Sequence, residues 1–225
     1  MILYAAISNY IAQFLPVGSD IINSVEAAGH KQQLPLIQPT GAHALRFLTD
    51  LHQPEIILEI GTAIGYSAIH LAEAAPKAEI ITLEMDAGRA GQAVANIQKA
   101  GLSDRIHVVV GDAEVIIPKL EQRFDMIFLD AAKGKYELFF ELVFPKWKDG
   151  GLLIADNVLF RGMVALEDDQ IDRKYRSMVK KLKQFNQMLA EHDQIETLFL
   201  PVGDGLAVSR KLKRGDTICI KGRNY

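Results

Sequence analysis

The sequence predicts an α/β fold in which a doubly wound, mostly parallel sheet lies between layers of helices. The first observation is that short β-branched and apolar runs alternate with helical patterns from residue 55 onward. Such runs are typical of strands buried on both faces of a parallel sheet. The second observation is the segment 57–67, Ile-Leu-Glu-Ile-Gly-Thr-Ala-Ile-Gly-Tyr-Ser. It indicates a buried strand, a glycine turn and the start of a helix.

Three helices are expected before the first strand. Apolar residues recur at helical spacing over 2–15, 19–29 and 41–51. Proline and glycine separate the first two helices, and Gly29 ends the second. Residues 1–52 are therefore expected to form an N-terminal helical cap that packs on the sheet or lies over a ligand.

The sheet core is expected over residues 55–210. The predicted strands are 56–60, 79–84, 106–110, 125–129 and 151–155, and the helices between them are 66–74, 87–100, 113–120 and 136–144. Gly101 is the expected C-terminal cap of the second of these helices. A long amphipathic helix is predicted over 168–191. A C-terminal antiparallel hairpin, 195–200 with 206–210, follows it around a Gly-Asp-Gly turn.

Composition is that of an ordinary globular protein. The 225 residues are 49% hydrophobic and 24% charged, enough for one sizeable core, so a single domain over 1–225 is expected. The net charge of −3 and the pI near 6.1 give no domain-wide basic field that would indicate nucleic-acid binding. A local basic patch remains possible, since residues 211–225 form a basic tail.

A cytoplasmic location is predicted. The single cysteine, Cys219, cannot form an internal disulfide and is expected to be an ordinary strand residue near the tail. No apolar run approaches the roughly 18 to 20 residues that a membrane-spanning helix needs. Residues 1–15 lack a basic leader, so they indicate a helix rather than a signal peptide.

The glycine turn is the first candidate binding site. Gly61 and Gly65 let the backbone approach a ligand closely, and the helix start offers free N–H groups. The dinucleotide fingerprint Gly-x-Gly-x-x-Gly is absent. Glu59 would repel a pyrophosphate but would accept hydrogen bonds from an ammonium group. The turn therefore fits S-adenosylmethionine better than a nicotinamide, and the alternative is a turn without a ligand.

Two further acids end neighbouring strands at the edge where ligands bind in such sheets. Glu84, 25 residues after Glu59, can accept hydrogen bonds from both ribose hydroxyls. Asp112 can accept the adenine amino group while Ala113 packs on the ring. The alternatives are a solvated strand-end acid for Glu84 and a helix N-cap for Asp112.

A third group of polar residues favours a metal ion. Asp130 and Asp156 end two consecutive predicted strands, and Asn157 follows directly. Two carboxylates and an amide oxygen suit Mg²⁺, while the alternative is a pair of capping aspartates. Lys133 would lose its proton more easily beside a divalent cation and is the candidate general base. Lys135 is its rival two residues on.

The remaining titratable residues give weaker indications. The six histidines (His30, His43, His52, His70, His107 and His192) have no metal-ligand spacing and are expected to be core or surface residues. The lysines of the 168–191 helix are expected to form a solvated face rather than an RNA track.

Three motifs together resemble a known enzyme family. They are Glu59-Ile-Gly-Thr-Ala-Ile-Gly-Tyr-Ser67, Asp130-Ala-Ala-Lys133 and Asp156-Asn-Val-Leu-Phe-Arg-Gly162. They resemble the cation-dependent O-methyltransferases, which include catechol and caffeoyl-CoA O-methyltransferases. The resemblance covers about residues 34–210. It is greatest to the bacterial branch that methylates 5-hydroxyuridine at the tRNA wobble position.

The resemblance implies a Rossmann-like class I methyltransferase sheet, S-adenosyl-L-methionine and Mg²⁺ as cofactors, and a homodimer. The cofactor contacts that it implies are Ile37, Ser67, Glu84, Asp112, Ala113 and Asp130, in addition to the turn residues Glu59 and Gly61. The metal ligands that it implies are Asp130, Asp156 and Asn157, and the base is Lys133. Ala131 and Ala132 stand where catechol enzymes have His-Trp, which counts against a catechol-type substrate.

Three functional hypotheses follow. The first is Mg²⁺-dependent methylation of 5-hydroxyuridine in the tRNA anticodon region, with Arg161 and the basic residues of 173–183 and 211–223 on RNA phosphates. The second keeps the chemistry but takes a small catechol or phenol, which the acidic pI favours. The third is a cofactor-binding regulatory protein without turnover, against which the complete set of polar residues argues.

Overall fold

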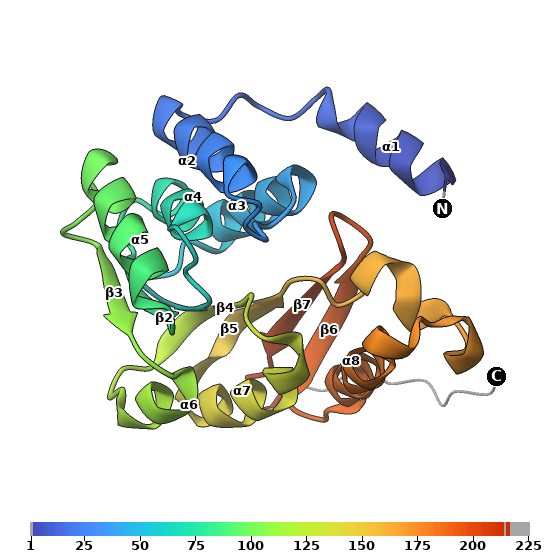
Figure 1. Cartoon of the computed structure of the whole chain (residues 1–225). Coiled ribbons are helices and arrows are strands. Elements are labelled where there is room, and N and C mark those ends of the chain that lie inside the picture. The colour runs from blue at the N-terminus through green and yellow to red at the C-terminus, as the bar shows by residue number, and fades with distance from the viewer. Residues whose placement is uncertain (1, 214, 217–225) are drawn as a thin grey trace.

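The computed structural model describes residues 2–213, 215 and 216 and shows a seven-stranded sheet covered by helices on both faces (Figure 1). The strands are β1 (Ile56–Ile60), β2 (Glu79–Glu84), β3 (Ile106–Val110), β4 (Phe124–Leu129), β5 (Trp147–Ala155), β6 (Ile195–Leu200) and β7 (Leu206–Lys211). Their order is β3-β2-β1-β4-β5-β7-β6. The predicted fold class is confirmed.

The sheet has one topological switch point. β1 pairs in parallel with both β2 and β4, so the chain winds outward in opposite directions from β1. Only the C-terminal hairpin is antiparallel: β7 lies between β5 and β6 and runs against both. A crevice is expected beyond the carboxyl ends of β1 and β4, where the winding direction changes.

Two hydrophobic cores lie on the two faces of the sheet. On one face pack α2 (Asp20–Lys31), α3 (Pro39–His52), α4 (Tyr66–Ala74) and α5 (Ala87–Lys99), and on the other α6 (Ala113–Ile116), α7 (Tyr136–Val143) and α8 (Arg173–Glu191) (Figure 1). Figure 1 shows α1 (Ile2–Ala12) joined to α2 by a long linker, and α1 contacts α3. Short 3₁₀ turns lie at Ile117–Lys119, Lys133–Lys135, Phe144–Lys146, Phe160–Ala165 and Asp168–Gln170.

Several predicted boundaries shift for identifiable reasons. β5 begins at Trp147 rather than at 151, because Trp147 already pairs with Phe124 before the register shifts. The predicted helix 168–191 begins only at Arg173, where the Asp172 side chain accepts a hydrogen bond from a backbone N–H of the first turn. α3 begins earlier than predicted, at Pro39, since proline fits the first helical turn.

The structure corrects part of the prediction of a basic tail over residues 211–225. Lys211 belongs to β7 and is only 9% exposed, with its ammonium donating to the carbonyl oxygens of Phe144 and Trp147 at 2.9 and 3.0 Å. It is therefore unavailable to an RNA phosphate. Cys219, Lys221 and Arg223, on which other predictions rest, lie outside the described residues. No helix in the described part of the chain is both long and apolar enough to cross a bilayer.

Candidate active site

A cavity of about 290 Å³ opens at the carboxyl ends of β1, β2, β3 and β4. It lies at the switch point of the sheet, as the topology leads one to expect. Its walls bring together most of the predicted residues: Ile37, Gly61, Ser67, Glu84, Asp112, Ala113, Asp130 and Lys133. The cap contributes the loop 35–37 to one wall.

The first glycine of the turn joins β1 to β4. Gly61 has φ +105°, and a Cβ at this position would lie 2.0 Å from the carbonyl oxygen of Asp130. Its N–H donates to Leu83 O of β2 at 3.0 Å. Only glycine allows both the conformation and this close approach of two strand ends. Gly65, with φ +86°, is the N-cap of α4 and aims the start of that helix at the cavity.

Glu59 lies beneath the turn rather than on the cavity wall. Its carboxyl is fully buried and accepts a hydrogen bond from Thr82, whose hydroxyl lies 2.6 Å from that of Thr62. Burial raises the pKa of Glu59 to about 7, against the lowering effect of the Ser67 and Thr82 hydroxyls. The structure thus gives Glu59 a part in supporting the turn, whereas the sequence suggested direct contact with an ammonium group.

Glu84 and Asp112 are oriented by backbone N–H groups. The two oxygens of Glu84 accept from Ala63 N at 2.8 Å and from Asp86 N at 2.9 Å. Asp112 accepts from Glu114 N at 3.0 Å, so it is the N-cap of α6 and a cavity residue at the same time. Both acids are held in fixed positions before any ligand binds.

The two aspartates of the predicted metal set meet at adjacent strand ends. Leu129 of β4 pairs with Ala155 of β5, and Asp156 N donates to Leu129 O at 3.0 Å. Asp130 and Asp156 therefore follow directly from neighbouring positions in the sheet. Burial, and then the negative charge of Asp130, raises the pKa of Asp156 to about 8. Burial also raises the pKa of Asp130, while Lys133 lowers it.

These residues fit a divalent cation. Oδ1 of Asp156 accepts from Asn157 N at 2.7 Å, but its buried Oδ2 has no hydrogen-bond partner within the described chain. Asn157 adopts φ +58°, a conformation that asparagine tolerates better than most residues. No three His, Cys, Asp or Glu side chains of the described residues gather as a metal cluster. An Asp-Asp-Asn set needs only two such residues, with the amide as a third oxygen donor.

The two candidate lysines have different partners. Both line the cavity. The ammonium of Lys133 lies 3.6 Å from Oδ1 of Asp130, whereas Lys135 forms an ion pair with Glu114 of α6. Lys133 is therefore the one directed toward the aspartates.

Sequence reasoning missed two residues of this site. The buried Tyr136 hydroxyl donates to the backbone oxygen of Asp156 at 3.0 Å. Asp204, in the β6–β7 turn, accepts from Arg161 N, and its charge helps to raise the pKa of Asp156. The turn itself was predicted, but its place beside β5 depends on β7 inserting between β5 and β6.

Comparison with known proteins decides the family. The family model described as O-methyltransferase matches residues 19–212. The chain belongs to this O-methyltransferase family. A catechol O-methyltransferase of Niastella koreensis is 34% identical over 223 residues, covering 92% of this chain and 97% of the relative. A caffeoyl-CoA O-methyltransferase of Populus kitakamiensis is 30% identical over 175 residues, covering 75% and 74%.

A solved structure extends the likeness to the whole fold. The O-methyltransferase from Bacillus cereus in complex with SAH has a TM-score of 0.80 and 27% identity, covering 92% of this chain and 97% of that one. The predicted enzyme class, an O-methyltransferase, is confirmed. The relatives named above carry catechol and caffeoyl-CoA in their names, so they favour the small-phenol hypothesis over the tRNA hypothesis.

Proposed function

We propose that this O-methyltransferase transfers the methyl group of S-adenosyl-L-methionine to a hydroxyl of a small phenolic compound that carries a second oxygen on the adjacent ring carbon. The observation that carries the proposal is the pair of acids at adjacent strand ends, the partly buried Asp130 and the buried Asp156, beside the cavity and Lys133. Two adjacent oxygens would allow a substrate to bind a cation in that place through both of them.

The first half of the cavity would bind the cofactor, which supplies an electrophilic methyl group. Glu84 would accept the ribose hydroxyls and Asp112 the adenine amino group beside Ala113, since all three residues line the cavity. Ser67, in the first turn of α4, would contact the amino-acid end of the cofactor together with the free N–H groups there. Ile37, from the cap, covers this half of the cavity.

The second half would hold the cation and the acceptor. Asp130, Asp156 and Asn157 would bind Mg²⁺, which supplies Lewis acidity that lowers the pKa of a bound hydroxyl. Nζ of Lys133, once its own proton has passed to solvent, would accept the proton of that hydroxyl, and Asp130 Oδ1 lies 3.6 Å from it. The Tyr136 hydroxyl holds the backbone of Asp156 in position through its hydrogen bond to the carbonyl oxygen of that residue.

The tRNA hypothesis came from the motif resemblance, and it would need the basic side chains of α8 to contact RNA phosphates, but several of these side chains already have partners. Lys183 donates to Leu166 O at 2.8 Å, Lys181 to Gly134 O at 3.2 Å and Arg176 to Ile171 O at 2.9 Å. Such contacts leave fewer free cations for a phosphate backbone. We therefore place the small phenol first and keep tRNA as the rival in the same assay.

A homodimer is proposed from the apolar surface of the cap. Ile7, Ile11 and Phe14 of the α1 region and Phe47 of α3 are all more than two-fifths exposed. Ile7, Ile11 and Phe47 border an apolar hollow of about 600 Å³. Monomers rarely expose contiguous apolar surface of this kind, and a second copy of the chain would cover it. Light scattering should give twice the chain mass, and a monomer at micromolar concentration would contradict the proposal.

The experiment for the proposed function measures transfer of a labelled methyl group from S-adenosyl-L-methionine to three acceptors. They are catechol, phenol, and tRNA isolated with 5-hydroxyuridine. Methylation of catechol in preference to phenol is expected. Transfer to tRNA alone would replace this substrate class with the RNA one. Cofactor binding without transfer to any acceptor would favour the regulatory hypothesis.

A further inference from the structure

A second cavity lies beneath the helical cap, behind the active site. Its volume is about 210 Å³, it opens to solvent, and it is lined by the linker between α1 and α2 and by residues of α2, α3 and α4. The apolar part of its wall includes Leu15, Ile22 and Ala42, and the polar part is Asn23, Glu26, His43, Arg46, Tyr66 and His70. Tyr66 lines both this cavity and the active site.

His70 has an unusual environment in this cavity. Its residue is only 7% exposed, and neither ring nitrogen has a hydrogen-bond partner among the described residues. Buried polar groups in native proteins nearly always have partners, so a molecule within the cavity is the natural source. The Tyr66 ring packs edge-on against the imidazole with centroids 4.7 Å apart, which fixes its orientation.

The protonation state of His70 limits which chemical groups of a ligand could bind it. Burial, followed by the charges of Arg46 and His43, lowers its pKa to about 4. The imidazole is therefore neutral at pH 7 and presents one N–H donor and one acceptor nitrogen. A hydroxyl can pair with either nitrogen.

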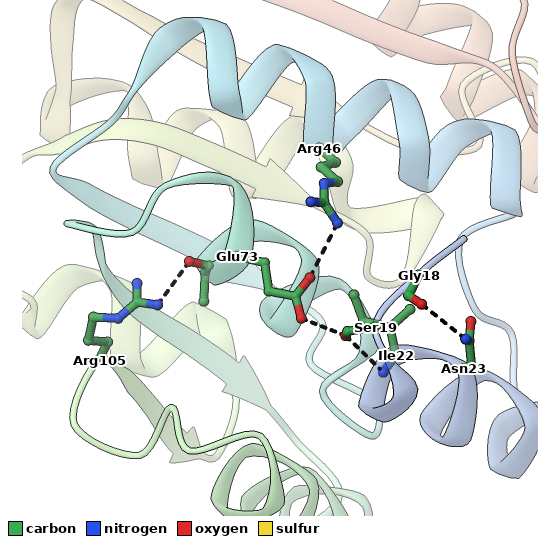
Figure 2. A network of polar contacts seen from close by, with 8 residues as sticks. Gly18, Ser19, Ile22, Asn23, Arg46, Glu73 and Arg105 are labelled. Carbon is green, nitrogen blue, oxygen red and sulfur yellow. Dashed lines mark hydrogen bonds and ion pairs between the residues drawn. The ribbon is translucent and has the colours of Figure 1, made fainter. Parts of the chain in front are cut away.

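Polar contacts hold the wall of the cavity in place before any ligand binds. Figure 2 shows Ser19, at the start of α2, and Arg46 of α3 both reaching Glu73 of α4, at 2.6 and 3.2 Å. The same view shows Asn23 donating to Gly18 O at 3.0 Å, which closes the linker onto α2. Three helices are thus joined around the space that His70 faces.

We propose that this cavity is a second binding site, for a neutral single-ring molecule that carries a hydroxyl group. Its apolar wall with a few polar groups is typical of small-molecule sites. An apolar cavity of about 150 Å³ accommodates benzene, so this larger one has room for a substituted ring. Arg46 and Glu26 bring one charge of each sign, which favours a neutral ligand over an ion.

Occupation of this site should affect cofactor binding. Tyr66 follows Gly65 directly and is the first residue of α4, so its position also sets the wall of the cofactor cavity. A ligand that binds differently when the cofactor is present must change the cofactor's affinity by the same factor.

Phenol is the probe for the test. The full-length protein, labelled with ¹⁵N-histidine and saturated with SAH, is titrated with phenol while the ring nitrogens are followed by NMR. Saturable shifts of both His70 nitrogens are expected. His70→Leu, which also assigns these signals, should weaken phenol binding at this site at least about tenfold, as followed by the ring-nitrogen shifts of His43, which lines the same cavity. The matched control is His30→Leu, because His30 lies on α2, is mostly exposed and does not line the cavity.

Two results would overturn the proposal, and His70→Gln assigns the His70 signals of the wild-type titration if His70→Leu fails to fold. The first is an absence of any His70 shift up to the solubility limit of phenol, which would mean that the cavity holds water only. The second is equal phenol affinity in folded His70→Leu and wild type. Neither result bears on methyl transfer, so failure here is distinct from failure of the proposed function.

Discussion

The two halves of the active-site cavity differ in how their acids are satisfied. In the cofactor half, Glu84 accepts two backbone N–H groups and Asp112 accepts one. Beside the other half, the buried Asp156 has an oxygen without a partner among the described residues, and it lies next to the partly buried carboxyl of Asp130. The first half is organised by hydrogen bonds within the protein. The second half is left electrostatically incomplete.

The difference indicates what each half needs from a ligand. Backbone N–H groups fix the direction of an acid that then receives hydroxyl and amino donors, as a nucleoside supplies. Two adjacent carboxyls instead favour an added positive charge, because the negative charge of Asp130 raises the pKa of the buried Asp156. A fold that carries this unfavourable pair gains nothing from it in the absence of a cation.

The largest expected effect is on the incomplete half. Asp156→Ala should lower methyl transfer by about 10³-fold or more, because it removes one of the two carboxylates that would hold the cation. Cofactor affinity, measured by calorimetry, should change little, since Asp156 does not line the cofactor half. The matched control is Asp149→Ala, an exposed acid at the other end of the same strand. Equal activity in both variants would remove Asp156 from the mechanism.

The lysine pair gives the next effect. Lys133→Met should reduce kcat by about 10²-fold, the lower range for a general base, because Nζ of Lys133 lies beside Asp130 and its neutral amine would be the proton acceptor. Lys135→Met should retain most activity, since Lys135 is paired with Glu114. Steady-state kinetics at saturating cofactor measures both, and the reverse ranking would assign the base to Lys135.

A third variant, Gly61→Ala, tests the close approach of the ends of β1 and β4 between the two halves of the cavity. Gly61→Ala should destabilise the fold by on the order of 3 kcal/mol, because φ +105° is strained for alanine and its Cβ would meet Asp130 O. Gly91→Ala is the control: that glycine lies in α5, with nothing within 4 Å of an added Cβ. The control should stabilise the protein by about 1 kcal/mol in urea unfolding. A neutral Gly61→Ala would show that the strand ends need not approach.

Glu59, which lies beneath the glycine turn, should make the free energy of unfolding depend on pH. Folding raises the pKa of Glu59 from 4.5 to about 7, so the folded protein binds the extra proton and this contribution is lost as pH rises through that interval. Glu59→Gln should remove the loss. Between pH 4 and 8, wild type should therefore lose about 3 kcal/mol of unfolding free energy relative to the variant. If the free energies of unfolding of cofactor-free wild type and Glu59→Gln change in parallel with pH, folding does not raise the pKa of Glu59.

Sequence reasoning reached the cofactor half more completely than the other half. Glycine spacing and strand-end acids are local features, and local features placed Gly61, Ser67, Glu84 and Asp112 on one cavity wall. Parallel strand order likewise brought Asp130 and Asp156 together.

The parts that sequence reasoning missed depend on long-range packing. Asp204 reaches the site only because β7 inserts beside β5, and local pattern does not encode that insertion. Glu59 is buried beneath the turn, where Thr82 of the neighbouring strand donates to one of its two oxygens. The orphaned ring of His70, expected to be an ordinary core or surface residue, depends on three cap helices meeting around it.

The most direct test of the central claim is an anomalous difference map from crystals grown with Mn²⁺, SAH and catechol. We expect one strong peak in contact with the side chains of Asp130, Asp156 and Asn157, beside the catechol oxygens. A peak elsewhere, or ordered catechol at this place with no peak, would contradict the assignment of these residues to a cation.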